Sequence, residues 1–324
     1  MAFARNWKQN WVAEGPTCAT DRDIPLLNRV FSEAFTERYR KDGMLGVRVP
    51  HLNPVIWKFA IADAGDGAMV WRDEGGAIVA FNIVHRSGIE GWMGPLVVQP
   101  DHQGRGLGKT IVTTGIEWLK THGAKVIGLE TMPRTMDNVG FYSALGMLPG
   151  HLTVTVTLEG VASSTIPESL ARTPEEEREG VMEECRVLTE SLLPGHDFTR
   201  EMALTDRMQI GDTVLLRRGK ELAGFALCHT VPLVDGRLRE ELRVLKLVAR
   251  SDDDFDLLVT QLAAFCRRSG TRRIAIRAQG SYPEIYRRLI MRGARVRWTD
   301  LRMTVHGYSE TVAAAGVVLS NWEI

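Results

Sequence analysis

Apolar and polar residues alternate along the first 160 positions with two different periods. Apolar side chains recur at helical spacing in residues 24–43 and 53–64. Short apolar runs separated by glycine-containing turns follow at 67–73, 76–86 and 91–98, a pattern typical of an antiparallel meander. This part of the chain therefore predicts two helices followed by three strands.

Further elements are predicted after residue 100. A helix with one apolar face covers 109–121, an apolar strand covers 124–131, a short helix covers 134–147, and a strand with period two covers 151–160. With an edge strand at 12–17, the order becomes β-α-α-β-β-β-α-β-α-β. Such an order predicts an α/β (α+β) fold with a mixed sheet and helices on both faces.

The second half of the chain repeats this order in a weaker form, with a period of about 145 to 150 residues. We expect two tandem domains, 1–160 and 178–324, joined by residues 161–177. This segment is rich in Ser, Thr, Pro and Glu, which predicts a linker or an exposed helix start. The last residues, 313–324, are apolar enough for a strand docked on a sheet. The repeated elements are strands within 214–231, 242–251, 272–278 and 297–305, and helices at 255–270 and 281–294.

The composition excludes several classes of protein. The 324 residues are 44% hydrophobic and 25% charged, as is usual for globular proteins. Basic and acidic residues number 40 each, so the formal net charge is zero and no overall basic field attracts nucleic acid. No run approaches about eighteen apolar residues, and "MAFARNWKQNW" lacks the apolar core of a signal peptide. We expect a cytoplasmic protein without nucleic-acid or membrane partners.

The cysteines and histidines predict no metal site. Cys18, Cys185, Cys228 and Cys266 are far apart and form no Cys-x-x-Cys pair, so we expect buried thiols rather than a disulfide framework. The eight histidines show no ligand spacing such as His-x-x-x-His.

The stretch "DHQGRGLGKT", residues 101–110, resembles a phosphate-binding loop. A Walker A loop requires glycine where Gln103 stands, and a dinucleotide fingerprint requires glycine where Lys109 stands. Both nucleotide interpretations therefore fail. A third pattern, Gln/Arg-x-x-Gly-x-Gly/Ala between a strand and a helix, fits Gln103 to Gly108 without a gap.

A loop of this kind suits an anion. The unpaired N–H groups and the positive end of the following helix point to one place, and glycines at 104, 106 and 108 let the backbone approach a pyrophosphate closely. The alternative is a glycine-rich turn that binds nothing. In the second half, the corresponding residues 251–254 are Ser-Asp-Asp-Asp, whose carboxylates would repel a pyrophosphate.

Together with a second motif, this loop resembles the signature of the GNAT N-acetyltransferase superfamily. The family pattern continues with a strand and a short helix ending in Phe-Tyr-x-x-x-Gly-Phe, and here residues 141–147 read "FYSALGM". The resemblance covers about residues 12–158 well and 178–306 as a degenerate repeat. It identifies the chain as a tandem GNAT protein with one working site.

The resemblance implies that acetyl-CoA, or another acyl-CoA, is the co-substrate. The strand before the loop would hydrogen-bond the pantetheine arm and thioester carbonyl, with an N–H near Val98 stabilising the oxyanion. Many members carry an arm-binding Asn seven residues before the Tyr, a position held here by Thr135, with Asn138 one helical turn closer. Lys109 is a better phosphate partner than Arg105. The expected cofactor-binding residues are Leu96, Val97, Val98, Gln103, Gly104, Arg105, Gly106, Leu107, Gly108, Lys109, Thr110, Thr135, Asn138, Phe141 and Tyr142.

The resemblance also assigns catalytic roles. Tyr142 matches the general acid that protonates the departing CoA thiolate, a role that suits a hydroxyl with a pKa near 10. The usual base position is occupied by Trp92, which leaves Glu90, two residues earlier on the strand, and Glu130, twelve residues before the Tyr. We prefer Glu130 as the base. Alternatively, the Glu130 carboxylate forms an ion pair at the end of its strand and has no catalytic role.

Two functions remain open at this point. The first is an N-acetyltransferase that moves an acyl group directly from acetyl-CoA to a primary amine of a small-molecule or peptide acceptor. The second is a non-catalytic acyl-CoA-binding sensor. This function stays possible because the second half lacks the glycine loop and could bind a partner instead. That half either completes the acceptor pocket or supplies an interface, and the chain is expected to be a monomer or a homodimer.

Overall fold

The protein is described here by a computed structural model that covers residues 13–322. The predicted order of elements in the first half is confirmed, although residue 12 of the expected edge strand and the residues before it lie outside the described part. The elements are β1 (Glu14–Cys18), α1 (Ile24–Lys41), α2 (Pro54–Ala64), β2 (Ala68–Arg72), β3 (Ile78–Ser87), β4 (Glu90–Val98), α3 (Leu107–Thr121), β5 (Val126–Thr131), α4 (Met136–Ala144) and β6 (Met147–Glu159).

The second half contains every element that its sequence pattern predicts, and two further helices. The segment 161–177, expected as a linker or an exposed helix start, includes the short strand β7 and the first residues of α5. The elements are β7 (Glu168–Ser169), α5 (Glu175–Leu192), α6 (Thr199–Met208), β8 (Gly211–Arg218), β9 (Glu221–His229), β10 (Glu241–Ala249), α7 (Asp252–Arg268), β11 (Arg273–Gln279), α8 (Pro283–Met291), β12 (Arg295–Val305) and β13 (Val317–Ser320).

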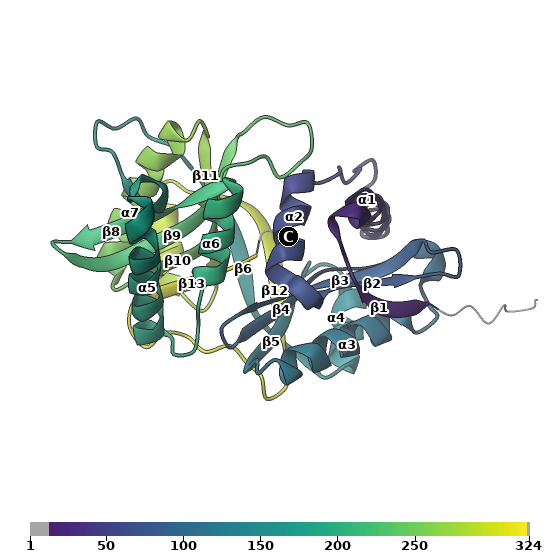
Figure 1. The fold of residues 1–324 in the computed structure, drawn as a ribbon. Coiled ribbons are helices and arrows are strands. Elements are labelled where there is room, and N and C mark those ends of the chain that lie inside the picture. The colour runs from purple at the N-terminus through teal and green to yellow at the C-terminus, as the bar shows by residue number, and fades with distance from the viewer. Residues whose placement is uncertain (1–12, 323–324) are drawn as a thin grey trace, which may run out of the picture.

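One continuous sheet of 13 strands runs through both halves, in the order β1-β2-β3-β4-β5-β12-β6-β11-β10-β9-β8-β7, with β13 paired to β10. Strand β12 of the second half lies between β5 and β6 and pairs antiparallel with both. Strand β6 of the first half in turn pairs with β11 of the second. The two halves therefore share their central strands, as the side-by-side arrangement in Figure 1 shows.

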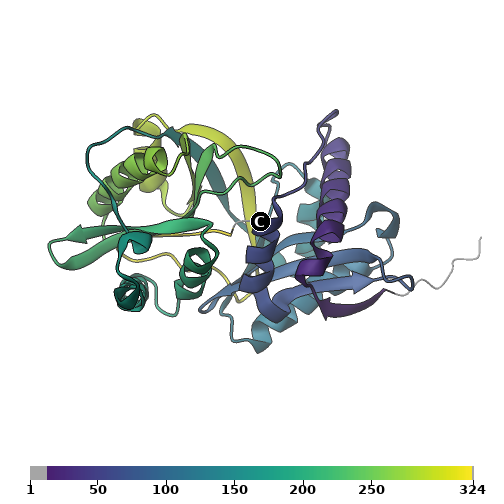
Figure 2. The same ribbon diagram turned by 45° about the horizontal axis from the view of Figure 1, so that its top comes forward.

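Each half of the sheet is covered by helices on both faces (Figure 2). Alternate residues of a strand pack on opposite sides, because side chains of a strand alternate between its faces. On β3, Phe81 and Ile83 pack in the core under α1 and α2, whereas Ala80 and Val84 pack in the core under α3. None of the described helices has the length and apolarity needed to cross a membrane.

The two halves also contact each other through helices and turns. Helix α2 packs against α6, where Phe59 lies in one small buried cluster with Leu204 and Ile210. The turn between β3 and β4 lies directly against the loop between α5 and α6. A Cβ on Gly88 would meet the Gly195 carbonyl oxygen at 2.0 Å, so glycine is required there.

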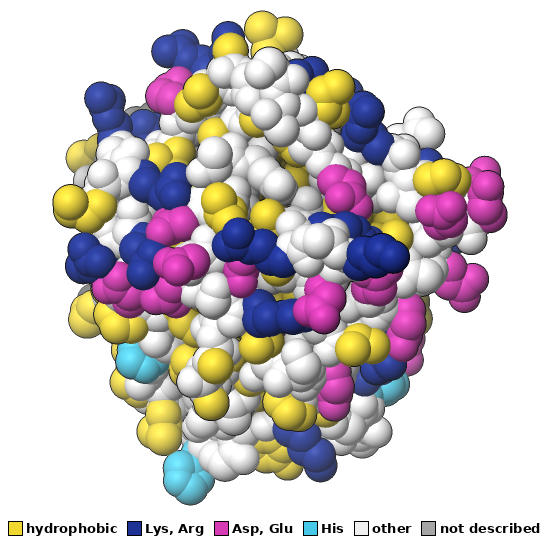
Figure 3. All heavy atoms as spheres, turned by 90° about the vertical axis from the view of Figure 1, so that its left-hand side faces the viewer, with side chains coloured by type: hydrophobic (Ala, Val, Ile, Leu, Met, Phe, Trp, Pro, Cys, Tyr) yellow, Lys and Arg dark blue, Asp and Glu magenta, His cyan; other side chains and the backbone are white. Residues whose placement is uncertain are grey.

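Charges on the outer face of the second half are mixed. Figure 3 shows Lys and Arg side chains interspersed with Asp and Glu over this face. Helix α5 illustrates the pairing, with Arg186 bound to Glu183 and Arg217 bound to Glu184. This face therefore presents no broad patch of one sign to a charged partner.

The described cysteines are all free, and one of them differs from expectation. Cys185, Cys228 and Cys266 are buried, as the sequence predicts, but Cys18 is exposed. Cys18 lies at the end of β1, which forms an edge of the sheet. Within residues 13–322, β1 pairs on one side only, with β2, which leaves this side chain exposed.

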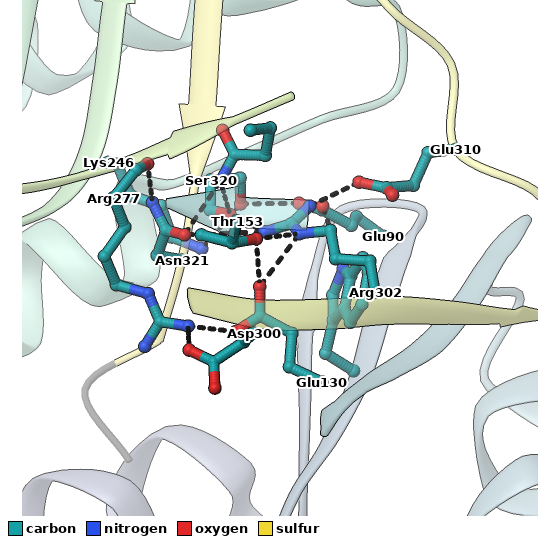
Figure 4. A network of polar contacts seen from close by, with 12 residues as sticks. Glu90, Glu130, Thr153, Lys246, Arg277, Asp300, Arg302, Glu310, Ser320 and Asn321 are labelled. Carbon is teal, nitrogen blue, oxygen red and sulfur yellow. Dashed lines mark hydrogen bonds and ion pairs between the residues drawn. The ribbon is translucent and has the colours of Figure 1, made fainter. Parts of the chain in front are cut away.

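A buried arginine on β12 holds the shared strands together (Figure 4). Arg302 is 2% exposed and lies directly opposite Glu130 of β5, to which its Nε donates a hydrogen bond of 2.9 Å. Its other nitrogens donate to Glu310 and to the Ser320 carbonyl oxygen, and its guanidinium lies over the Trp92 ring at 4.4 Å. A single cation thus connects β5, β12 and the C-terminal segment.

Replacing this arginine should destabilise the whole sheet. In Arg302→Leu the Glu130 and Glu310 carboxylates lose a buried cation, and we expect a loss of about 3–5 kcal/mol in the free energy of unfolding, measured by urea denaturation at pH 8. The loss should be smaller at pH 5, where carboxylates take up protons more readily. Arg287→Leu, which removes an exposed pair with Glu284, is the control and should change stability far less. Similar losses in both variants would contradict this account of β12.

Candidate functional site

A cleft of about 560 Å³ opens in the first half, between the C-terminal half of α1, the end of β4, the glycine loop and α4. Most of its walls come from segments that the sequence analysis singled out. The lining residues are Ala34, Phe35, Glu37, Arg38, Lys41, Leu96, Val97, Val98, Gln103, Gly104, Gly106, Gly108, Lys109, Asp137, Asn138, Phe141 and Tyr142.

Four of the predicted cofactor-binding residues are not part of this lining. Leu107 is buried in the core under α3, and Thr110 turns its hydroxyl toward the Gly106 carbonyl oxygen at 3.5 Å. Thr135 is buried and donates a hydrogen bond of 2.6 Å to Asp42, while the exposed Arg105 lies on the loop outside the lining. Asn138, the alternative to Thr135, does line the cleft.

The glycine loop has the geometry of an anion site. Gly104 and Gly106 have φ values of +75° and +87°, which other residues rarely adopt, and Gly106 is the N-cap of α3. No side chain among residues 13–322 caps this helix, which leaves its first N–H groups available to a ligand. At α7, the corresponding helix, Ser251 caps the Asp254 N–H and three aspartates occupy the first turn. The second half therefore has its helix end already satisfied.

Strand β4 has a free edge where the cleft begins. Its parallel pairing with β5 ends at Met93 and Leu129, whereas its antiparallel pairing with β3 continues to Val98. The Gln103 side chain donates a hydrogen bond of 3.0 Å to the Val98 carbonyl oxygen and so ties the loop to the strand. Residues 94–98 thus keep one edge open to an extended ligand.

A second cavity, of about 180 Å³, adjoins the cleft and shares five lining residues with it: Phe35, Arg38, Leu96, Asn138 and Tyr142. Two of its lining residues, Trp298 and Asp300, come from β12 of the second half. Its remaining lining residues are Tyr39, Met93, Gly94, Pro95, Leu129, Glu130, Thr131 and Met132.

Tyr142 lies at the junction of the two cavities. Its side chain is 7% exposed, and this burial raises the pKa of its hydroxyl well above the usual value for tyrosine. The phenol therefore keeps its proton throughout the physiological range and is suited to donate it.

Glu130 lines the smaller cavity but is held in ion pairs. One carboxylate oxygen accepts hydrogen bonds from Thr153 at 2.6 Å and Arg302 at 2.9 Å, and the other accepts from Arg277. Burial alone would raise the pKa of Glu130, but Arg277 and Arg302 outweigh it and lower that pKa. The carboxylate is consequently a weak proton acceptor.

Glu90 lies in neither cavity of this site. Its carboxylate is buried between the two halves, where it accepts hydrogen bonds from Trp92 at 2.9 Å and from Ser320 at 2.7 Å. The structure thus brings Tyr142 and Glu130 together and leaves Glu90 in the interface.

The sequence analysis named no site residue in α1 or β12. Phe35, Arg38 and Lys41 follow one another at helical spacing and bring a ring and two cations to the cleft, a signal visible in the sequence. Trp298 and Asp300 give no such signal, because their position depends on where β12 pairs. No group of three or more potential metal ligands occurs among residues 13–322.

Comparisons with known proteins show a family match for the first half of the chain and a shared fold for both halves. The model of the acetyltransferase (GNAT) family matches residues 28–147, which include the cleft and its loop. No curated protein matches the chain.

Several solved structures share the fold across both halves. A protein from Pyrococcus horikoshii, named as a candidate acetyltransferase, is 15% identical with a TM-score of 0.65, and the match covers 98% of this chain and 99% of that one. A tandem GNAT protein from the clavulanic acid biosynthesis pathway is 12% identical with a TM-score of 0.57, over 91% and 97%. N-myristoyltransferase from Saccharomyces cerevisiae with bound myristoyl-CoA is 9% identical with a TM-score of 0.63, over 94% and 84%. The chain thus shares, across both halves, the fold of these proteins, among them a tandem GNAT protein.

The left-handed glycines allow a direct test of the loop. In Gly106→Ala the added Cβ strains the backbone that would face the anion, and we expect the Kd for acetyl-CoA, measured by calorimetry, to rise about tenfold or more. Gly123→Ala is a matched control, since Gly123 has a φ of +81° beyond the other end of α3. Both variants should lose similar stability, about 1 kcal/mol. Equal acetyl-CoA affinity in the two would contradict a binding role for the loop.

Proposed function

We propose that the protein is an acyl-CoA-dependent N-acyltransferase that transfers an acetyl group directly from acetyl-CoA to a primary amine, because residues 28–147 match the model of the acetyltransferase (GNAT) family. The observation that carries the proposal is that Tyr142 lines both the cleft and the adjoining cavity. A thioester in the cleft and an amine in the cavity would meet beside its hydroxyl. Direct transfer requires that meeting, since both substrates must be held together.

The cleft offers each part of acyl-CoA a matching group. The loop N–H groups at the start of α3, with Lys109 beside them, suit the pyrophosphate. The open edge of β4 suits the amides of the pantetheine arm, and a backbone N–H near Val98 would stabilise the oxyanion that forms on the thioester carbonyl. Asn138 lines both cavities and can bond the arm where they join.

The reaction then follows from these positions. The nitrogen lone pair of the amine attacks the thioester carbonyl carbon, and the carbon–sulfur bond breaks as the tetrahedral intermediate collapses. The Tyr142 hydroxyl donates its proton to the departing thiolate, which would otherwise be a poor leaving group in a partly apolar cleft. The products are an N-acetylated amine and free CoA.

Removing the Tyr142 hydroxyl should slow transfer without weakening cofactor binding. For Tyr142→Phe we expect kcat to fall by about 10²–10³-fold, with little change in the KM for acetyl-CoA, when free thiol is measured with a panel of primary amines. Tyr286→Phe, on α8 outside the lining of both cavities, is the control and should keep the wild-type rate.

Two outcomes would contradict this proposal. Turnover by Tyr142→Phe at the wild-type rate would remove the phenol from the mechanism. Tight acetyl-CoA binding by the wild-type protein, with no thiol released for any amine, would favour an acyl-CoA sensor instead.

A further inference from the structure

The smaller cavity contains two carboxylates that are compensated to different degrees. Both oxygens of Glu130 are engaged, one by Arg302 and Thr153 and the other by Arg277. Two cations therefore contact this one carboxylate, although Arg302 also pairs with Glu310 and Arg277 also pairs with Asp300. Glu130 is still the carboxylate of this cavity that has two cations in contact with it.

Asp300 is the less compensated carboxylate. One of its oxygens accepts from Arg277 at 3.0 Å, and the other accepts from the indole N–H of Trp298 at 2.9 Å. Arg277 is the one cation in ion-pair contact with Asp300 among the described residues, and it is shared with Glu130 (Figure 4). Negative charge in the cavity is thus concentrated on Asp300, a residue of the second half.

We propose that Asp300 is the base that takes a proton from the acceptor, and that the acceptor is a small cationic primary amine. The proposal rests on the function proposed above and names its acceptor class and a catalytic residue. Strand β12 would thereby complete, from the second half, a site whose acyl-CoA side lies wholly in the first.

The electrostatic surroundings support this role. Burial raises the pKa of Asp300 to about 6, with Glu130 adding to the rise while Arg277 and Arg302 oppose it. Tyr39 of α1 also faces Asp300, and Arg38 of α1 lines the same cavity. At pH 7 Asp300 is mostly ionised and still basic enough to accept a proton, as efficient general-base catalysis requires.

These groups account for every proton that moves during acetyl transfer from the thioester to the amine. An ammonium group enters the cavity and gives one proton to Asp300, which passes it to solvent. The free amine attacks the thioester carbonyl, and the second amine proton leaves as the tetrahedral intermediate collapses. Tyr142 supplies the proton that ends on the CoA sulfur and is itself reprotonated by that second proton. The net change is an ammonium and a thioester giving an amide, a thiol and one proton.

The size and walls of the cavity limit the acceptor. A volume of about 180 Å³ is slightly more than the roughly 150 Å³ that accommodates a benzene molecule. Tyr39 and Trp298 form an aromatic wall, with ring centroids 6.2 Å apart, which attracts a cation through the ring faces. An ammonium group on a short chain with an arene-sized portion fits this space, whereas a carboxylate beside the amine would be repelled by Asp300.

The acceptor class is tested with phenethylamine and L-phenylalanine, which share a skeleton and differ by one carboxylate. We expect kcat/KM for acetyl transfer, followed by thiol release and by mass spectrometry of the product, to be at least about tenfold higher for phenethylamine. A preference for L-phenylalanine would overturn the cationic acceptor class.

The base is tested by the pH dependence of kcat/KM for the better of these two amines. The wild-type kcat/KM should rise with pH through an apparent pKa near 6, as Asp300 loses its proton. We call this rise the acidic limb of the pH profile. In Asp300→Asn this limb should vanish and kcat/KM should fall by about 10²–10⁴-fold, with the Kd for acetyl-CoA unchanged. Asp256→Asn is the matched control, because it removes a carboxylate of α7 that is paired with Arg288 of α8. This variant should keep the wild-type rate and the rise of kcat/KM near pH 6.

A third variant separates a chemical role from a structural one. Trp298→Phe keeps a ring in the wall but removes the hydrogen bond that favours the ionised form of Asp300, so the limb should move to higher pH. A limb that survives in Asp300→Asn and disappears in Glu130→Gln would overturn the assignment and leave the acyltransferase function intact. A wild-type protein that transfers to no amine would overturn both proposals together.

Discussion

The insertion of strand β12 between β5 and β6 is the constraint on which both the fold and the site depend. The two halves cannot separate without breaking the backbone ladders on both sides of this strand. Its register also decides which side chains reach the smaller cavity, because a slip of one residue in a strand moves every side chain to the opposite face. Trp298 and Asp300 lie in the cavity wall only in the observed register.

Corresponding strands of the two halves differ in whether one edge is left unpaired: β4 has an open edge in the first half, whereas β13 pairs with the edge of β10 in the second. On β4, parallel pairing ends at Met93 and the following residues line the cleft. On β10, parallel pairing with β11 ends at Val244, and β13 then pairs antiparallel with Lys246–Ala249. The C-terminal strand therefore occupies in the second half the edge that an acyl-CoA arm would use in the first. Together with the acidic start of α7, this pairing leaves the second half, within residues 13–322, without the open edge and uncapped helix start of the first.

Local patterns predicted most of this structure, and long-range pairing accounts for what they missed. The alternation of periods placed the strands and helices of the first half in their order, and the glycine loop located the cleft. The sequence predicted a linker or an exposed helix start at the beginning of α5, where three glutamates follow Pro174, but it did not predict the helix that continues from there. Val181, Cys185 and Leu188 follow at helical spacing and could have indicated it. The two arginines that pair with Glu130 are 147 and 172 residues away, so no local signal distinguishes a paired carboxylate from a base.

Stability and proton transfer are linked through the same buried arginine. Arg302 neutralises Glu130 directly, and it also lowers the pKa of Asp300 against the effect of burial. Without it, Glu130 would depend on Arg277 for its charge compensation, and less of that cation would remain for Asp300. The pKa of Asp300 would then rise, so that the carboxylate would be protonated over more of the neutral range and would accept fewer protons from an amine. A residue that joins the shared strands therefore also keeps the proposed base ionised, which is a physical reason for burying a cation at such a desolvation penalty.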